Sequence, residues 1–169
     1  MAKPKNARDV LVTELKEIYS AERQLVRASP KMLRAVETQV LKEGMTGRRE
    51  RAERIIETLD DIFEQMDVTK SRPKNIAAEG LITDAQEHLE ELSENKILLE
   101  PVLLSTLQKL EHYCIASWGT ARSLGRLLDE KPVAELMENL LKDGRDYDEY
   151  LTGVAEKELN PRMRKHDAG

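Results

Sequence analysis

The segment LQKLEHYCIASWG, from Leu107 to Gly119, carries the pattern that decides the fold. Its apolar side chains recur at the 3.6-residue period of an α-helix. The apolar stripe comprises Leu104, Leu107, Leu110, Cys114 and Trp118. One carboxylate, Glu111, lies on the same stripe, so we expect it to be buried. Because an unpaired buried charge is costly, Glu111 needs a metal ion, a cationic side chain or a proton as its partner.

The composition around this segment is that of a soluble bundle of long helices. Charged residues make up 35% of the 169 residues and aromatic residues only 4%. This length suits one domain with a hydrophobic core. The net charge of -5 favours solubility. It argues against a general nucleic-acid-binding protein, which would present a basic face.

No segment of the sequence indicates export or a membrane anchor. No apolar run approaches the roughly 18 residues of a transmembrane helix, and the N-terminal MAKPKNARDV lacks the apolar core of a signal peptide. A single cysteine excludes an internal disulfide framework. We therefore expect a cytoplasmic protein. Three histidines, one of them His166 near the C-terminus, leave little for a nitrogen-rich metal site.

Amphipathic periodicity predicts four long helices and one shorter helix. The long helices are expected over residues 7–38, 45–66, 101–128 and 132–159, and the shorter one over residues 76–95. Gly44 is expected to separate the first two helices, and Pro101 to lie in the first turn of the third long helix. Pro30 is expected to bend the first helix, and Pro161 to end the last.

The order of these helices predicts an all-α, ferritin-like four-helix bundle. Two helical hairpins are joined by a long connection, and the shorter helix is interpreted as an additional crossover helix. The bundle domain is expected over residues 7–159. Residues 1–6 are predicted to be disordered, and residues 160–169 to form a flexible basic tail.

Polar side chains recur at mid-height on the expected inward faces of all four long helices. They are Glu22, Arg48, Arg51, Glu111 and Asp143. A plain up-and-down bundle does not need carboxylates in its core, so the matched height of these groups is the specific signal for a site.

Four stretches, ELKEIYSAERQL, AAEGLITDA, LQKLEHYCIASWGT and DYDEYL, together resemble the YciE/YciF family of bacterial ferritin-like stress proteins. The resemblance covers roughly residues 7–159. It implies a ferritin-like bundle that is often dimeric and has a potential two-metal carboxylate site. It also implies an association with stress.

This chain keeps two of the family's glutamates, as Glu22 and Glu111, and departs from the family at other site positions. The second-helix pattern H-L-E-E-T of the family is replaced, with Arg48 at the histidine and Arg51 at the inward carboxylate. In the third helix the last glutamate of E-H-Y-E is Cys114. In the fourth helix a pair of glutamates becomes Asp143 and Gly144.

These departures change the expected chemistry of the bundle centre. A pair of divalent metals needs several carboxylates to balance its charge. Arginine cannot coordinate a metal, but it can neutralise carboxylates through paired hydrogen bonds. We therefore expect Arg48 and Arg51 to replace metal as the cations of a degenerate site. The preferred function is then a non-catalytic, dimeric protein without a cofactor.

Three alternatives remain open from the sequence. Iron or manganese could still bind at Glu22, Glu111 and Asp143, with oxidase or metal-storage activity. A shift of the second helix could then recruit Glu50 or Glu53. The chain could instead be a dimeric interaction scaffold. Finally, the arginine side chains could reach solvent and leave Glu111 uncharged.

Other reactive or aromatic side chains favour structural roles. Cys114 is interpreted as an inert buried thiol. His112 is adjacent to Glu111 in sequence but lies about 100° round the helix, which favours a contact rather than a ligand position. We expect Trp118 and Tyr113 in the core or an interface. No phosphate-binding loop, G-x-S-x-G or C-x-x-C motif is present.

Overall fold

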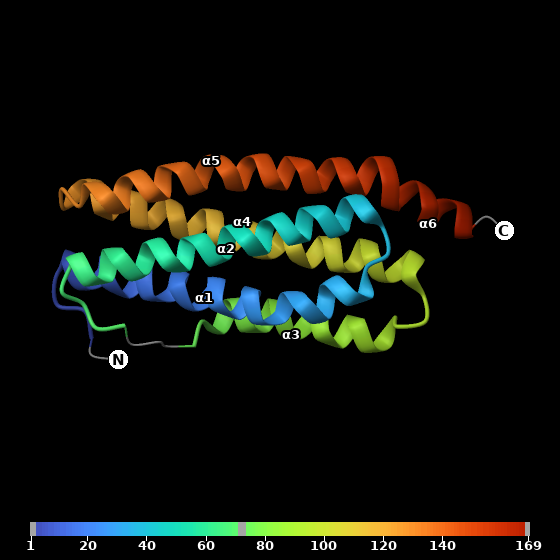
Figure 1. Ribbon diagram of the computed structural model, residues 1–169, viewed down its shortest axis with the longest axis horizontal. Helices are drawn as coiled ribbons and strands as arrows, with labels where there is room; N and C mark the ends of the chain where they lie inside the picture. The colour runs from blue at the N-terminus through green and yellow to red at the C-terminus, as the bar shows by residue number, and fades with distance from the viewer. Residues whose placement is uncertain (1–2, 71–73, 168–169) are drawn as a thin grey trace.

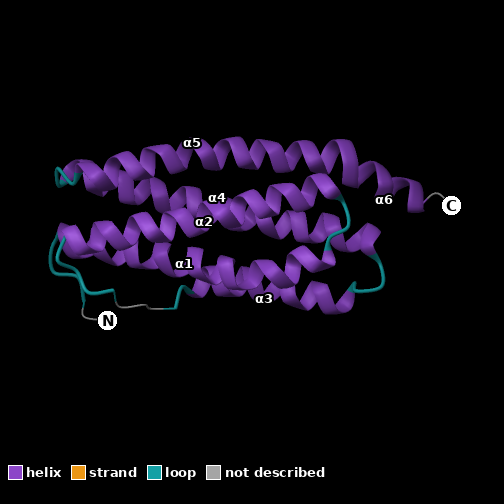
Figure 2. Ribbon diagram, in the orientation of Figure 1, coloured by secondary structure: helices purple, strands orange, loops and turns teal. Residues whose placement is uncertain are grey.

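The computed structural model describes residues 3–70 and 74–167, and within them every regular element is a helix (Figure 2). The four long helices are α1 (Ala7–Ala35), α2 (Gln39–Gln65), α4 (Lys96–Leu127) and α5 (Lys131–Val154). Helices α1 and α2 form one antiparallel hairpin, and α4 and α5 form the other (Figure 1). No helix in the described residues is long and apolar enough to cross a lipid bilayer.

Helix α3 (Ile76–Glu91) is the crossover between the two hairpins. It packs against α1 and α4 and so covers the seam between them. Within the described residues, no helix covers the seam between α2 and α5 on the opposite side (Figure 1). A single long crossover is the connection found in ferritin-like bundles. The predicted all-α bundle of two hairpins with a crossover helix is confirmed.

The turn between α1 and α2 differs from the prediction. Helix α1 ends at Ala35 rather than residue 38, and α2 begins at Gln39 rather than residue 45. The cause is the buried carboxylate of Glu100. Its Oε1 accepts hydrogen bonds from the backbone nitrogens of Glu37 (2.6 Å) and Thr38 (2.8 Å), and its Oε2 accepts one from the Thr38 hydroxyl. These bonds hold the connecting residues extended, and α2 starts directly afterwards.

Gly44 lies within α2, so the prediction that it separates two helices is wrong. Its role is packing. A Cβ atom at this position would lie 2.5 Å from Cε1 of Tyr150 on α5. The Tyr150 hydroxyl then donates a hydrogen bond of 2.5 Å to the backbone oxygen of Val40. The glycine lets this ring lie directly on α2.

Pro101 also differs from its predicted place. Pro101 lies in the second turn of α4, because that helix begins at Lys96 behind Asn95, whose side chain accepts from the Leu98 nitrogen. Helix α1 is continuous through Pro30.

The prediction that Pro161 ends the last helix is wrong. A π-helical turn, η1 (Ala155–Leu159), follows α5, and α6 (Asn160–Asp167) continues from it. Pro161 is the second residue of α6 and so lies inside a continuous run of helix. Leu159 is buried, and Arg162 donates a hydrogen bond of 2.7 Å to the Thr38 hydroxyl oxygen. Of the predicted disordered end and flexible tail, residues 1–2 and 168–169 lie outside the described residues.

The hydrophobic core has two large parts, one toward each end of the bundle. One part includes Leu15, Leu59, Trp118 and Met137. The other includes Leu41, Leu99, Leu103 and Leu151. The helix positions between these two parts, at mid-height, carry the buried side chains of Glu22, Arg48 and Glu111.

We expect Glu100→Ala to lower the free energy of unfolding by roughly 3 kcal/mol, because three donors at the α1–α2 turn lose a charged acceptor. Glu90→Ala is the matched control, since Glu90 is exposed and makes one surface ion pair with Lys31. The control should change the same quantity by less than about 1 kcal/mol. Urea titrations followed by circular dichroism measure both. Equal effects of the two substitutions would contradict this account of the turn.

Candidate functional site

Three buried charged side chains from three different helices meet at the centre of the bundle. Glu22 on α1 is 0% exposed, Arg48 on α2 is 3% exposed and Glu111 on α4 is 1% exposed. Arg51, one turn after Arg48, adjoins them at the edge. We refer to these four residues as the arginine–carboxylate cluster.

Arg48 joins the two glutamates. Its Nη1 and Nη2 donate to the two carboxylate oxygens of Glu22 at 2.8 and 3.0 Å, and its Nε donates to Oε2 of Glu111 at 2.6 Å. Bidentate, charge-assisted bonds of this kind are among the strongest hydrogen bonds in proteins. One guanidinium therefore bridges α1, α2 and α4.

Arg51 binds the remaining oxygen of Glu111. Its Nη2 donates to Oε1 of Glu111 at 2.5 Å, and its Nη1 donates to the backbone oxygen of Asp143 on α5 at 2.9 Å. The side chain is 12% exposed, so it lies at the outer edge of the cluster. The two positive charges of the arginines thus balance the two negative charges of the glutamates.

The protonation of the cluster follows from its geometry. Burial on its own would lower the pKa of Arg48, but the adjacent carboxylates of Glu22 and Glu111 raise that pKa well above its ordinary value. Burial lowers the pKa of Arg51, and the adjacent carboxylate of Glu111 opposes that change. Burial also raises the pKa of the Cys114 thiol well above its usual range. Cys114 is therefore a protonated, buried group at neutral pH, as an inert thiol should be.

Trp118 and Gly144 pack beside the cluster. The guanidinium carbon of Arg48 lies 5.8 Å from the centre of the Trp118 ring. A Cβ atom on Gly144 would lie 2.7 Å from Cζ3 of Trp118 and 3.1 Å from Oε1 of Glu111. No larger side chain fits at position 144 unless the indole moves.

Asp143 does not face the cluster, and the expectation that it does is wrong. The residue is exposed, and only its backbone oxygen takes part, as the acceptor for Arg51. Adjacent helical positions are about 100° apart, and Gly144 holds the inward position. Glu50 is exposed, and Glu53 pairs with Arg49 on the surface, so a shifted register does not bring them inward.

The side chains of the cluster do not provide the ligands of a two-metal centre. Among the described residues, no three histidine, cysteine, aspartate or glutamate side chains are grouped so that they could hold a metal ion. Both oxygens of Glu22 and both of Glu111 accept hydrogen bonds from arginine. His112 is exposed and lies 3.3 Å from Asp148, and His88 lies 3.5 Å from Asp84 on the surface of α3.

The sequence analysis missed the structural roles of the buried residues Glu100 and Asn75. Glu100 is the acceptor that forms the α1–α2 turn, and its signal is a lone charge in the apolar run ILLEPVLL. Asn75 caps α3 through the Ala78 nitrogen and donates to the Tyr113 hydroxyl at 2.6 Å. Its signal is an asparagine directly before a helical pattern. Tyr113 accordingly has a packing role under the crossover.

Comparisons with known proteins match most of the length of this chain. A family described as a domain of unknown function (DUF892) matches residues 6–164. Protein YciF of Escherichia coli strain K12 is 34% identical over 157 residues, which are 92% of this chain and 94% of YciF.

Two solved structures share the architecture. The crystal structure of the E. coli stress protein YciF matches with a TM-score of 0.86, and 93% of this chain and 99% of that chain are covered. YcfI from Rhodopseudomonas palustris matches with a TM-score of 0.85 at 28% identity, covering 91% and 98% of the two chains. On its length, sequence and fold, this chain belongs to the YciE/YciF family of DUF892 proteins.

Proposed function

We propose that this chain is a non-catalytic, metal-independent member of its family, in which arginine takes the place of metal at the centre of a ferritin-like bundle. The proposal includes a cytoplasmic homodimer that serves in stress physiology. The observation that carries it is Arg48, which donates hydrogen bonds to Glu22 and Glu111 at once.

The balance of charge in the cluster supports a bundle centre without metal. Every carboxylate oxygen of Glu22 and Glu111 accepts from a guanidinium. A pair of divalent ions would have to displace both arginines and would bring about four positive charges against two carboxylates. Placing those ions beside two guanidiniums that cannot lose a proton would be strongly repulsive.

Steric packing supports the same proposal. A carboxylate side chain at position 144 would collide with Trp118, which is fully buried. Cys114, with its raised pKa, is 3.6 Å from Arg48 Nη2. The volume that a fourth-helix ligand would need is therefore held by an indole ring. The proposed stress association rests on the similarity to YciF, which is described as a stress protein.

Protein purified without chelators should contain far less than one iron or manganese per chain, because Glu22 and Glu111 are already neutralised by arginine. Elemental analysis measures this content. Its melting temperature should also be the same with added iron, added manganese or a chelator. A content near two metal ions per chain would overturn the proposal.

Arg48→Met should lower the free energy of unfolding by roughly 3–5 kcal/mol at neutral pH, since it strands buried carboxylates. Adding Glu22→Gln should recover part of the loss. Stranded carboxylates have raised pKa values in the folded state, so they contribute stability at low pH that is lost as pH rises. The deficit of Arg48→Met should therefore shrink toward about pH 5.

Arg51→Ala and Arg49→Ala are comparison variants for which smaller losses of stability are expected than for Arg48→Met. Arg51 lies at the edge and binds one carboxylate, so its loss should cost less than that of Arg48. Arg49 forms an exposed pair with Glu53, and its loss should change stability by less than about 1 kcal/mol. Denaturant titrations measure all variants. If Arg48→Met unfolds no more easily than Arg49→Ala, arginine is not the stabilising cation of the bundle.

Light scattering should report two chains per particle. The described surface exposes single large apolar side chains, such as Ile76 and Leu127, rather than the several distinct patches that a closed cage requires. A monomer, or a particle of a dozen or more chains, would refute the dimer.

A further inference from the structure

We propose that the groove between α2 and α5 binds a small organic carboxylate. The groove has a volume of about 310 Å³ and borders the arginine–carboxylate cluster. Its lining includes Gly44, Gly47, Arg51, Tyr147 and Tyr150. This ligand site is additional to the proposed metal-free role of the bundle.

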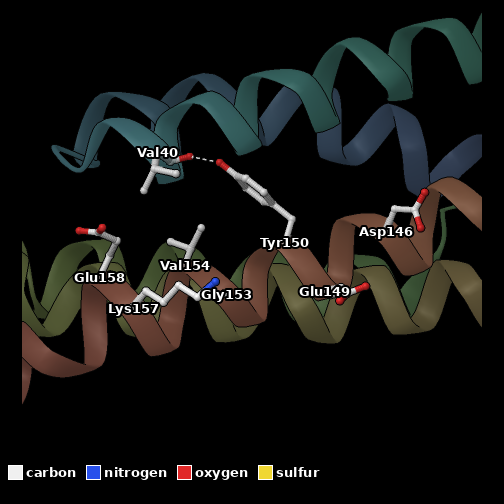
Figure 3. A pocket seen from close by; sticks show the side chains of 8 residues that line it. All are labelled: Val40, Asp146, Glu149, Tyr150, Gly153, Val154, Lys157 and Glu158. Carbon is white, nitrogen blue, oxygen red and sulfur yellow. Dashed lines mark hydrogen bonds between the residues drawn. The ribbon is translucent and has the colours of Figure 1, made fainter.

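The groove lies on the seam that no helix covers in the described part of the chain. A second groove of about 460 Å³ continues along the same seam, and Tyr150 borders both. Figure 3 shows the Tyr150 ring reaching from α5 toward Val40, while the other labelled side chains follow α5 and η1. Tyr150 thus forms one wall of the proposed site.

Two residues that line this groove each carry a hydrogen-bond donor with no acceptor within residues 3–70 and 74–167. The donors are Nε of Arg51 and the hydroxyl of Tyr147, and both atoms are buried. The guanidinium carbon of Arg51 lies 5.1 Å from the centre of the Tyr147 ring, so the two donors belong to side chains in contact. Buried donors are rarely left without a partner. A phenylalanine at position 147 would give the same ring packing. The hydroxyl of Tyr147 therefore adds nothing to the packing, and we expect it to have a hydrogen-bond partner.

The positive charge of Arg51 favours an anion as the acceptor for these two donors. Arg48 has three carboxylate oxygens as partners, whereas Arg51 has one, together with a backbone oxygen. Arg51 is therefore the less completely neutralised cation, and it is the one at the edge of the cluster. A carboxylate accepts well from a guanidinium N–H and from a phenol at the same time.

The walls of the groove suit a carbon skeleton. The rings of Tyr147 and Tyr150 are stacked, with centres 6.3 Å apart and planes inclined by 14°. A Cβ atom on Gly47 would meet nothing within 4 Å, so that side of the groove is open to a ligand. Glu43 borders the groove at an exposed position, and its charge opposes an anion there. These features favour an apolar acid with one carboxylate over a polyanion.

Benzoate and its neutral isostere benzamide test the charge requirement on the full chain. Isothermal titration calorimetry should show saturable benzoate binding, with benzamide at least about tenfold weaker. Tyr147→Phe should weaken benzoate about tenfold while leaving the protein folded and at least as stable as the parent. Glu43→Gln should tighten binding.

Tyr113→Phe is the matched control, because the Tyr113 hydroxyl already accepts from Asn75 away from the groove. It should leave benzoate affinity unchanged. The proposal is overturned if benzoate does not bind saturably, which is the result expected when water alone serves the two donors. It is also overturned if benzamide binds equally well or if Tyr147→Phe has no more effect than Tyr113→Phe. None of these results alters the metal content that tests the proposed function.

Discussion

The hydrogen bonds of Arg48 to two buried carboxylates are the constraint on which the arrangement of the helices depends. A buried charge is tolerated only when it is paired and hydrogen-bonded. Because the partners Glu22 and Glu111 lie on α1 and α4, the pairing fixes the height and rotation of three helices at once. Hydrophobic contacts are non-directional and would tolerate several such arrangements. The directional contacts of one guanidinium select among them.

The rest of the bundle is built around this polar layer. Apolar side chains fill the space toward both ends, and Trp118 adjoins the layer directly. The fourth long helix, α5, contributes a backbone oxygen and the small residue Gly144 instead of a charge. Its approach is therefore set by the size of an indole ring. The crossover α3 closes the seam between α1 and α4, and the grooves lie along the α2–α5 seam opposite.

Single residues show which features of the structure the sequence pattern predicts and which it does not. Helical period alone indicated that Glu111 is buried, and the matching heights of Glu22, Arg48 and Glu111 indicated one layer. The period does not distinguish neighbours such as Asp143 and Gly144, since both lie near the edge of a stripe. Helix ends were harder, because the α1–α2 turn is set by Glu100 and is separated from it by more than sixty residues of chain. Such long-range acceptors leave no local pattern beside the turn.

The π-helical turn η1 has a consequence for how the end of the bundle is aligned. A π turn holds one more residue than an α turn, so every later side chain is rotated by about 100° relative to a continuous α-helix. That phase lets Arg162 reach Thr38, which is itself bound to Glu100. The extra residue in η1 thus gives α6 the rotation at which Arg162 contacts the α1–α2 connection. Loss of a single residue there would turn Arg162 away from Thr38 while leaving the helical character of α6 intact.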